Sequence, residues 1–443
     1  MKIAIVGAGW AGLAAAVNAT KAGHDAIVFE AAPAIGGRAR ALNGTLPDGR
    51  AVVLDNGQHI LIGAYTDTLQ LMREVGLAPE ALMLRQPLSM PFVDGSGLQT
   101  PAWAAGWPAP LDALAAICTA RGWTLQDRWS LLSAATGWQL RGFRCAPAIS
   151  VQSLCVAVSP RVQQELIEPL CVSALNTPAA QASGQVFLRV LKDALFGIRG
   201  GSNLLLPTCD LSTLFPQAAV QTLTTSGHGA VRTSCRVETL RWQAPHWLVN
   251  EEAFDAVIWA TSASNAAAML MDSAGAAPDS IANSLQAWST TAAALRFEAI
   301  ATVYAFAPQA HPAQPALLPR PMLALRCTPQ MPAQFVFDRG QLGGPSGLLA
   351  FVVSASQGSR EALQAQVLAQ AAQQLLSLNL GPLQIVQTVV EKRATFACTP
   401  GLQRPLQRIA PGLLAAGDYV QGPYPATLEG AVRSGIAAAQ ALA

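Results

Sequence analysis

Three glycines near the N-terminus have a spacing that suits phosphate binding. Gly7, Gly9 and Gly12 form a G-x-G-x-x-G pattern after the apolar run 3–6, which has the length of a strand. In such a turn the first glycine permits the tight bend, the second lets the backbone approach a pyrophosphate, and the third lets helix and strand pack closely. The following helix would offer free N–H groups and a positive dipole end. These residues predict a dinucleotide-binding site.

An acidic residue completes the pattern. Residues 13–21 have helical spacing that Gly23 ends, and residues 26–29 form a second strand-like run. Glu30 closes this run, and its carboxylate can accept hydrogen bonds from both ribose hydroxyls while repelling a 2′-phosphate. The alternative is a secretory signal peptide, because Lys2 precedes an apolar run. The glycines inside the run and the second strand argue against it.

The length and composition limit the kinds of fold and partner that this site can have. The chain has 443 residues, of which 51% are hydrophobic and 12% charged, with a net charge of +2 and a mean hydropathy of +0.31. The length indicates two or three domains, and the charge indicates no nucleic-acid partner. The sequence lacks an uninterrupted run of about 18 apolar residues, so no transmembrane helix is expected. Such an apolar chain favours a large apolar cavity or a face that meets a membrane, with an alanine-rich composition as the alternative.

The cysteines and histidines show no metal-ligand spacing. No two cysteines form C-x-x-C, and no histidine lies near a cysteine pair. We therefore expect reduced, mostly buried thiols and no metal site. The residues concerned are Cys118, Cys145, Cys155, Cys171, Cys209, Cys235, Cys327 and Cys398, and His24, His59, His228, His246 and His311.

A second motif follows the first. Gly36-Gly37-Arg38 precedes a polar turn, the apolar run 51–54 and then Asp55-Asn56-Gly57-Gln58-His59. This order resembles the superfamily of FAD-containing amine oxidases and phytoene desaturases. The resemblance implies that Arg38 lies on the FAD phosphates, which a bidentate guanidinium suits well, and that Gly57–His59 lies against the flavin ring. For His59, a packed and hydrogen-bonded imidazole is favoured over an acid–base role.

The C-terminal stretch carries the same resemblance. Ala416-Gly417-Asp418-Tyr419 ends an apolar run, and Leu428-Glu-Gly-Ala-Val-Arg-Ser-Gly435 opens an alanine-rich helix. In phytoene-desaturase-like flavoenzymes this signature implies that Asp418 contacts FAD and that the helix N-terminus faces the flavin pyrimidine. The positive dipole end would stabilise an anionic reduced flavin. The alternative is a strand–turn–helix unit with a capping acid.

The resemblance also defines a set of site residues. It places the backbone of Val237, in a strand expected over 231–240, against the adenine. No catalytic residue is identified: Asp55, His59 and Tyr419 lie near the flavin by motif position, and a structural role is favoured for each. The residues expected to bind FAD are Gly7, Gly9, Ala11, Gly12, Glu30, Gly37, Arg38, Gly57, Gln58, His59, Val237, Gly417, Asp418, Thr427, Leu428, Glu429 and Ala431.

The order of the segments predicts an α/β protein with two interleaved domains. The resemblance implies a Rossmann-type FAD-binding domain, of the glutathione-reductase-like amine oxidase fold, formed by residues 1–75, 197–265 and 392–443. A discontinuous α+β substrate-binding domain is expected from residues 76–196 and 266–391. Alternating strand and helix patterns in the latter segment favour a sheet that floors a cavity.

The first substrate-side segment has mainly helical patterns. Six apolar or small residues recur every three or four positions between 122 and 143, which predicts a helix. A helix capped by Ser159 is expected to break near Pro169. Trp103 and Trp107 lie on an uncharged, proline-rich loop, either at a membrane interface or, as the favoured interpretation, folded onto the core. The six residues are Leu125, Trp129, Leu132, Thr136, Leu140 and Phe143.

Taken as a whole, the chain resembles the hydroxysqualene dehydroxylases, squalene-associated flavoenzymes of bacterial hopanoid biosynthesis. The motifs above and the Asn176-Thr-Pro178 turn carry this resemblance. It implies reductive removal of an allylic hydroxyl from a C30 isoprenoid, by hydride from reduced FAD, at the end of a long apolar tunnel. The alternatives are a carotenoid or phytoene-type desaturase, a flavin amine oxidase, and a non-enzymatic isoprenoid-binding chaperone.

The implied partners are an apolar isoprenoid substrate and an electron donor for FAD whose identity the sequence leaves open. We expect a cytoplasmic protein. Peripheral contact with the inner membrane is a further hypothesis, with the Trp103 and Trp107 loop as one candidate for that contact.

Overall fold

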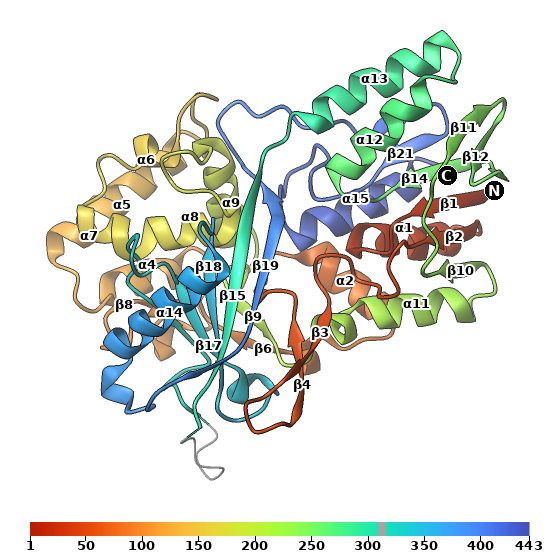
Figure 1. The fold of residues 1–443 in the computed structure, drawn as a ribbon. Helices are drawn as coiled ribbons and strands as arrows, with labels where there is room; N and C mark the ends of the chain where they lie inside the picture. Colours follow the sequence, from red (N-terminus) through yellow and green to blue (C-terminus); the bar gives the residue numbers. More distant parts are fainter. Residues whose placement is uncertain (309–315, 443) are drawn as a thin grey trace.

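The computed structural model describes residues 1–308 and 316–442, so His311 lies outside the described residues. Its main parts are a six-stranded sheet near the two chain ends, a five-stranded sheet, and a group of helices beside the second sheet (Figure 1). The expected α/β fold is confirmed. None of the helices in the described residues combines the length and the apolar character needed to cross a membrane.

The six-stranded sheet contains strands from both ends of the chain. Its order is β10-β2-β1-β14-β21-β20, and all neighbours are parallel except β20, which is antiparallel to β21. β14 is buried at every position, as expected for a parallel strand covered on both faces. The strands are β1 (Lys2–Val6), β2 (Asp25–Phe29), β10 (Gly229–Arg232), β14 (Ala256–Trp259), β20 (Arg408–Ala410) and β21 (Leu413–Ala415).

Two helices from opposite ends of the chain pack against each other beside this sheet. They are α1 (Trp10–Lys21) and α15 (Leu428–Gln440). A Cβ atom on Gly435 would lie 2.1 Å from the Ala11 carbonyl oxygen, so only glycine allows this approach. The last glycine of the C-terminal signature is therefore a packing residue that holds α15 against α1.

The five-stranded sheet is antiparallel, with the order β16-β17-β18-β15-β19. Along β15 (Phe297–Phe306), Tyr304 and Phe306 belong to the largest cluster of buried apolar residues, which we call the main core. Val303 and Ala305 instead pack with α14 (Arg360–Gln374). Successive side chains of a strand alternate between faces, so this sheet separates α14 from the main core. The strands are β15 (Phe297–Phe306), β16 (Met322–Ala324), β17 (Phe335–Asp338), β18 (Leu348–Ser354) and β19 (Gln384–Phe396).

Residues 102–199 form a group of helices that we call the helical lobe (Figure 1). α5 begins with a capping box, in which Thr124 Oγ1 accepts from the Asp127 N–H and the Asp127 carboxylate accepts from the Thr124 N–H. The elements are a 3₁₀ turn (Ala102–Ala104), α4 (Leu111–Thr119), α5 (Leu125–Leu140), α6 (Val151–Leu154), α7 (Pro160–Val162), a π-helical turn (Gln163–Ile167), α8 (Glu168–Leu175) and α9 (Gly184–Phe196).

The regularly spaced residues of α5 do not pack inward. Leu125, Trp129 and Leu140 are exposed, while Leu131 and Trp138 on another face of the helix are buried in the core. The periodicity predicted the helix correctly, but a periodic pattern defines a face and not what covers it.

The helix that begins at Pro160 does not break near Pro169. A π-helical turn precedes the proline, and the chain stays helical through α8 to Leu175. Pro169 lies in the first turn of α8, where the missing N–H is tolerated. The segment ends at Asn176, whose φ of 45° turns the chain. The expected break was therefore wrong.

Two of the expected domain boundaries fall inside elements. The boundary at 265/266 interrupts α12 (Ala263–Ala274), and α12 and α13 (Asp279–Ala293) pack against β11 (Leu240–Gln243) and β20 rather than joining the five-stranded sheet (Figure 1). The boundary at 391/392 interrupts β19, which continues because it stays paired with β15 as far as Phe396.

Smaller sheets and short helices complete the described chain. The strands are β3 (Ala41–Thr45), β4 (Ala51–Asp55), β5 (Leu61–Ile62), β6 (Met83–Gln86), β7 (Ser89–Pro91), β8 (Gly97–Gln99), β9 (Leu204–Pro207), β12 (His246–Val249) and β13 (Glu252–Phe254). The helices are α2 (Thr66–Glu74), α3 (Pro79–Leu82), α10 (Leu211–Leu214), α11 (Pro216–Thr225) and the 3₁₀ turns Arg339–Leu342 and Leu376–Leu378.

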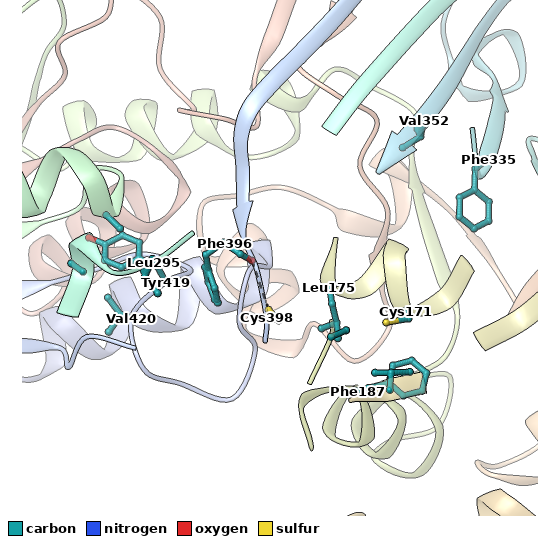
Figure 2. Packing of buried hydrophobic residues seen from close by; sticks show 14 of the residues in the cluster. Cys171, Leu175, Phe187, Leu295, Phe335, Val352, Phe396, Cys398, Tyr419 and Val420 are labelled. Atoms are coloured by element: carbon teal, nitrogen blue, oxygen red, sulfur yellow. Dashed lines mark hydrogen bonds between the residues drawn. The ribbon is translucent and has the colours of Figure 1, made fainter. Parts of the chain in front are cut away.

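The main core joins the lobe, the five-stranded sheet and the C-terminal region. Figure 2 shows Phe187 of the lobe, Phe335, Val352 and Phe396 of the sheet, and Tyr419 of the C-terminal motif, all within one cluster of buried residues. Because these side chains come from distant parts of the sequence, the core fixes the lobe and the second sheet relative to the C-terminal motif.

The cysteines are less buried than expected. All eight are free, but three are buried, three are half-buried, and Cys118 and Cys327 are exposed. Burial raises the pKa of the Cys155 thiol to about 12, so this thiol stays protonated near neutral pH. The expectation of mostly buried thiols was wrong, because helix ends and surface loops hold the others.

Candidate functional site

The glycine-rich turn leads from β1 into the N-terminus of α1. Gly7 has a φ of +110°, and a Cβ atom there would lie 2.7 Å from the Ala260 carbonyl oxygen. A Cβ atom on Gly12 would lie 1.9 Å from the Gly7 carbonyl oxygen. Gly9 is the N-cap of α1, and no side chain caps the helix. The first N–H groups of α1, that of Ala11 among them, are therefore available to an anion.

Glu30 follows β2 and lies next to this turn. Its Oε2 accepts a hydrogen bond from the Ala8 N–H at 2.8 Å, and its Oε1 accepts one from the Ala32 N–H at 2.8 Å. Gly37 packs against the same turn, since a Cβ atom on it would lie 3.2 Å from the Cα of Gly9. The carboxylate is thus fixed beside the start of α1, where the sequence predicted a ribose contact.

Val237 lies in a connecting segment and not in a strand. The strand expected over 231–240 is wrong, because β10 ends and β11 begins inside this range and Ser234, with a φ of 52°, turns the chain between them. The Cys235 N–H donates to the Glu30 carbonyl oxygen at 2.8 Å, which holds the segment at the end of β2. The contact of Val237 with adenine stays a prediction.

Arg38 and Asp418 form an ion pair between the two ends of the chain. Arg38 Nη2 lies 2.6 Å from Asp418 Oδ1, and Arg38 Nη1 donates to the carbonyl oxygen of Ala394 in β19. The neighbouring Asp418 raises the pKa of Arg38, so the guanidinium is charged. The Gly417 N–H donates to Ser434 Oγ of α15 at 2.7 Å. These contacts join the N-terminal motif, β19 and α15 at one point.

Gly57 and His59 form a turn that orients the imidazole. Gly57 has a φ of +102°, and His59 Nδ1 lies 2.9 Å from the Gly57 carbonyl oxygen. A carbonyl oxygen only accepts, so Nδ1 carries the proton of the neutral ring and Nε2 is unprotonated. Burial lowers the pKa of His59, and the charge of Arg38 lowers it further. His59 is therefore a packed, neutral imidazole near pH 7, and its contact with a flavin ring stays a prediction.

Sequence reasoning missed a buried pair below this turn. Arg339 Nη2 lies 3.6 Å from Asp55 Oδ2, and Arg339 Nη1 donates to Gln58 Oε1 at 3.1 Å. Asp55 Oδ1 accepts from the Leu211 N–H at 2.9 Å. Burial raises the pKa of Asp55 to about 6, although Leu211 and Arg339 act in the opposite direction. One signal in the sequence could have found Arg339. It closely follows the apolar run 335–337, and a basic residue that is buried next to such a run is normally paired with an acid.

Thr427 caps the N-terminus of α15. Its Oγ1 accepts a hydrogen bond from the Gly430 N–H at 3.0 Å. Leu428 and Ala431 lie in the first turn, and the Ala431 N–H donates to the Thr427 carbonyl oxygen at 3.0 Å. The remaining N–H groups of the first turn and the helix dipole give this end of α15 a partial positive charge.

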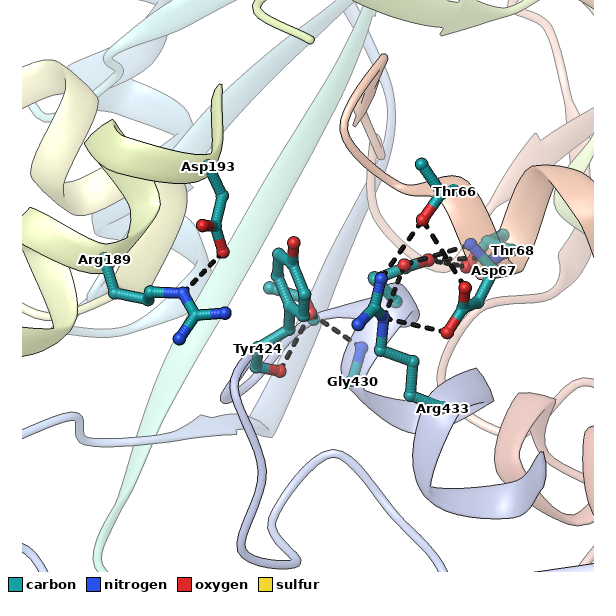
Figure 3. Close-up of polar contacts among 10 residues, drawn as sticks. Thr66, Asp67, Thr68, Arg189, Asp193, Tyr424, Gly430 and Arg433 are labelled. Atoms are coloured by element: carbon teal, nitrogen blue, oxygen red, sulfur yellow. Dashed lines mark hydrogen bonds and ion pairs between the residues drawn. The ribbon is translucent and has the colours of Figure 1, made fainter. Parts of the chain in front are cut away.

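The carboxylate of Glu429 binds α2 rather than pointing to a free site. It is fully buried and accepts from the Asp67 N–H at 3.1 Å, from the Thr68 N–H at 2.9 Å and from Thr68 Oγ1 at 2.7 Å. Arg433 Nε, which Figure 3 shows beside Asp67, donates to the same carboxylate at 2.7 Å. Glu429 therefore caps the N-terminus of α2, and these contacts occupy its carboxylate. The FAD contact of this residue stays a prediction.

Two buried hydroxyl groups near these motifs have no hydrogen-bond partner among the described residues. They belong to Thr302 of β15 and to Tyr419. Thr302 lies close to the turn at Gly57, since a Cβ atom on that glycine would be 3.8 Å from Thr302 Oγ1. Buried hydroxyl groups normally have a partner. Together with the uncapped α1 and the glycine-lined turn, they fit a ligand with phosphates at α1 and a polar ring near Gly57, which is the chemistry of FAD.

Two further expectations of the sequence concern metal ligands and cavities. Within 1–308 and 316–442, no group of three or more His, Cys, Asp or Glu residues could hold a metal ion. A cavity of about 600 Å³ lies along α15 and has Lys21, Glu74 and Arg433 in its wall. A second, of about 320 Å³, lies beside Arg326 and contains no residue of the motifs above. The apolar tunnel stays a prediction.

Comparisons with known proteins relate this chain to flavin-containing enzymes. A family model described as "Flavin containing amine oxidoreductase" matches residues 10–443. Hydroxysqualene dehydroxylase from Rhodopseudomonas palustris is 27% identical over 465 residues, which cover 98% of this chain and 96% of that protein. Zeta-carotene desaturase from Synechocystis is 40% identical over 86 residues, which are 19% of this chain and only 17% of that relative's length.

A solved structure shows the same fold. The crystal structure of an oxidoreductase from Methanosarcina mazei has a TM-score of 0.70 and 16% sequence identity, with 99% of this chain and 100% of that chain covered. At this identity the similarity concerns the fold alone.

Proposed function

Because this chain belongs to the flavin-containing amine oxidoreductase family and is an FAD-dependent oxidoreductase, we propose that it removes the allylic hydroxyl of hydroxysqualene to form squalene. The proposal rests on the similarity to the Rhodopseudomonas palustris hydroxysqualene dehydroxylase, which extends over 98% of this chain. The low charged fraction of 12% agrees with an apolar substrate.

The residues around the glycine turn would hold FAD. The N–H groups of α1 and the guanidinium of Arg38 would bind the pyrophosphate, Glu30 the ribose, and Gly57–His59 the flavin. Bound and reduced, FAD would supply the hydride that replaces the leaving hydroxide. Since Glu30 and α1 belong to one strand–helix–strand unit, the cofactor would be positioned by the most regular part of the fold.

The protein's own part is to position the substrate and to exclude water. The face of the five-stranded sheet that carries Tyr304, Phe335 and Val352 is apolar and buried. A dry, aromatic surrounding protects an allylic cation from capture by water. Thr302 Oγ1 lies on this face, beside the turn at Gly57, and is the buried hydroxyl best placed to hold a polar atom there.

A product assay tests the proposal. The purified protein would be incubated with hydroxysqualene, FAD and a chemical reductant without oxygen, and the extracted lipids analysed by mass spectrometry. We expect squalene in the presence of protein and none with heat-denatured protein or with reductant alone. Absence of squalene from a protein that demonstrably binds FAD would refute the proposal.

A carotenoid-type desaturase is the second candidate, favoured by the local similarity to zeta-carotene desaturase at 40% identity. It would run the redox chemistry in the opposite direction, with oxidised FAD accepting hydride from the substrate. The flavin absorbance separates the two. Hydroxysqualene should reoxidise the photoreduced protein if the dehydroxylase assignment is right, whereas phytoene or zeta-carotene should bleach the oxidised protein if the desaturase assignment is right.

A further inference from the structure

Exposed apolar side chains are concentrated on the helical lobe. Of the fourteen large apolar side chains that are exposed in the described residues, nine lie between residues 103 and 198. Single exposed apolar residues are ordinary, but a concentration of them marks an interaction surface. The nine are Trp103, Trp107, Leu111, Leu114, Leu125, Trp129, Leu140, Val156 and Ile198.

The outer face of α5 supplies the most exposed members of this set. Leu125 is 81% exposed, Trp129 72% and Leu140 83%. Their spacing of four and eleven residues puts them on one side of the helix, with Leu132 between them. A helix that met only water on this side would carry polar residues here. This apolar stripe of α5 is therefore a surface without a partner in the described chain.

The loop before α4 adds two tryptophans. Trp103 is 60% exposed and Trp107 42% exposed, and their rings pack edge to face with centroids 5.0 Å apart. Arg199 Nη2 donates to the Gly106 carbonyl oxygen at 2.5 Å, which fastens the loop to the end of α9. The favoured expectation of a loop folded onto the core is therefore wrong: the loop is held in place with its tryptophans outward, a placement typical of a membrane interface.

The lobe is also basic. Residues 102–199 contain eight Lys and Arg residues and five Asp and Glu residues, a net charge of +3, whereas the whole chain carries +2. Asp112 and Asp127 are buried, and Asp193 is paired with Arg189 at 2.6 Å. Glu165 is half-buried and accepts from Trp123 Nε1, so Glu168 is the exposed acid of the lobe. Arg121, Arg141 and Arg144 are exposed near the ends of α5, and Arg161 is exposed in α7. The charge that this surface presents is therefore mainly positive.

We propose that the helical lobe docks on a membrane surface that contains anionic lipids, with the α5 stripe and the Trp103–Trp107 loop in the interface. Apolar and aromatic residues would enter the headgroup region while the arginines bind lipid phosphates. At 9 and 16 residues, α4 and α5 lie on the bilayer rather than crossing it. The proposal rests on the proposed function only in that an isoprenoid substrate resides in the bilayer.

A second copy of this chain is the less suitable occupant. A two-fold symmetric interface would place the lobe opposite itself and bring two charges of +3 together. Anionic headgroups instead complement the arginines.

Vesicle co-sedimentation of the full-length, FAD-loaded protein tests this surface. The vesicles would be phosphatidylcholine with or without phosphatidylglycerol, and the variants would be Leu125→Gln/Trp129→Gln/Leu140→Gln and Trp103→Ser/Trp107→Ser. We expect the partition coefficient on anionic vesicles to fall by about tenfold or more in each variant, and wild-type binding to weaken with added salt. Met271→Gln/Leu406→Gln, which changes two exposed apolar residues outside the lobe, is the matched control and should bind as wild type.

Three outcomes would overturn the proposal: no binding of the wild type to anionic vesicles, unchanged binding of both lobe variants, or a wild-type dimer in sedimentation velocity that the α5 variant abolishes. A second measurement, the turnover of hydroxysqualene in detergent micelles, tests the proposed function without requiring membrane docking. Lobe variants that dock poorly should convert solubilised hydroxysqualene at the wild-type rate, whereas failure of the proposed function would remove that turnover from the wild type and leave its vesicle binding intact.

Discussion

Arg38 Nη2 and Asp418 Oδ1 lie 2.6 Å apart, although the two residues are separated by 380 positions in the chain. Each belongs to a motif expected to bind FAD, and each is held by further contacts: Arg38 by the Ala394 carbonyl oxygen, and the Gly417–Asp418 turn by Ser434 of α15. A guanidinium fixed in this way is oriented before any phosphate arrives. The cofactor site therefore depends on the assembly of both chain ends.

Replacing Asp418 by asparagine should weaken both folding and FAD binding. The substitution keeps the shape but removes the charge that holds Arg38, and a hydrogen bond to a charged group contributes about 1.5–3 kcal/mol. We expect the free energy of unfolding of the apoprotein, measured by urea titration, to fall by about 1–2 kcal/mol, and the Kd for FAD to rise. Arg73→Gln, which breaks the exposed pair with Glu80, is the control and should change neither. Equal stability of the Asp418 variant and wild type would show that the pair contributes nothing.

Gly435→Ala should separate α15 from α1. The new methyl group would lie 2.1 Å from the Ala11 carbonyl oxygen, a clash that only a backbone shift relieves. Overpacking of this kind costs about 1–3 kcal/mol, and the better helix propensity of alanine offsets about 1 kcal/mol of it. Differential scanning calorimetry should show a lower Tm. Gly137→Ala in α5, whose methyl group would meet only the end of Arg141 at 3.4 Å, should keep or raise the Tm.

Glu429→Gln should reduce stability while leaving the cofactor affinity of the folded protein unchanged within about twofold. Its buried carboxylate accepts from Asp67, Thr68 and Arg433, so an amide loses one acceptor oxygen and the charge. The expected loss is about 2–3 kcal/mol in the free energy of unfolding. A flavin-fluorescence titration supplies the second measurement. A large rise in the FAD Kd without loss of stability would instead mean that the side chain acts on the cofactor.

Asp55 should make stability depend on pH. Its pKa is raised by burial from the ordinary 3.8 to about 6, so the folded state binds this proton more tightly than the unfolded state. The stability contributed by the neutral carboxyl is therefore complete below about pH 4 and lost as the pH rises to about 6. Relative to the wild type, Asp55→Asn should gain about 3 kcal/mol between pH 4 and pH 7 in urea unfolding.

The control for this measurement is a carboxyl whose pKa is lowered instead of raised. Hydrogen bonds from Arg50 lower the pKa of Asp48, so its carboxylate favours folding as the pH rises. The stability from this carboxylate is lost only as the pH falls below its ordinary pKa of 3.8, so the difference between Asp48→Asn and the wild type should stay nearly constant between pH 4 and pH 7. A flat difference between Asp55→Asn and the wild type across this range would contradict the assigned pKa.

The sequence by itself determined the parts of this protein that are fixed by neighbouring residues. The first strand–helix–strand unit followed from Gly7, Gly12 and Glu30, because a positive φ, a close backbone approach and a strand-end acid are local requirements. The helix of α5 followed from the spacing of its own residues.

Only the tertiary structure decided which surfaces and charges meet. By its position in the signature, Glu429 was expected to contact the cofactor. It caps α2 instead, because the folded chain brings it to Thr68, 361 positions away. Arg339 pairs with Asp55 across two parts of the fold, and the stripe of α5 is exposed because Leu131 and Trp138 fill the core instead. Local pattern sets the conformation of a segment, whereas burial and pairing depend on partners brought together by the whole fold.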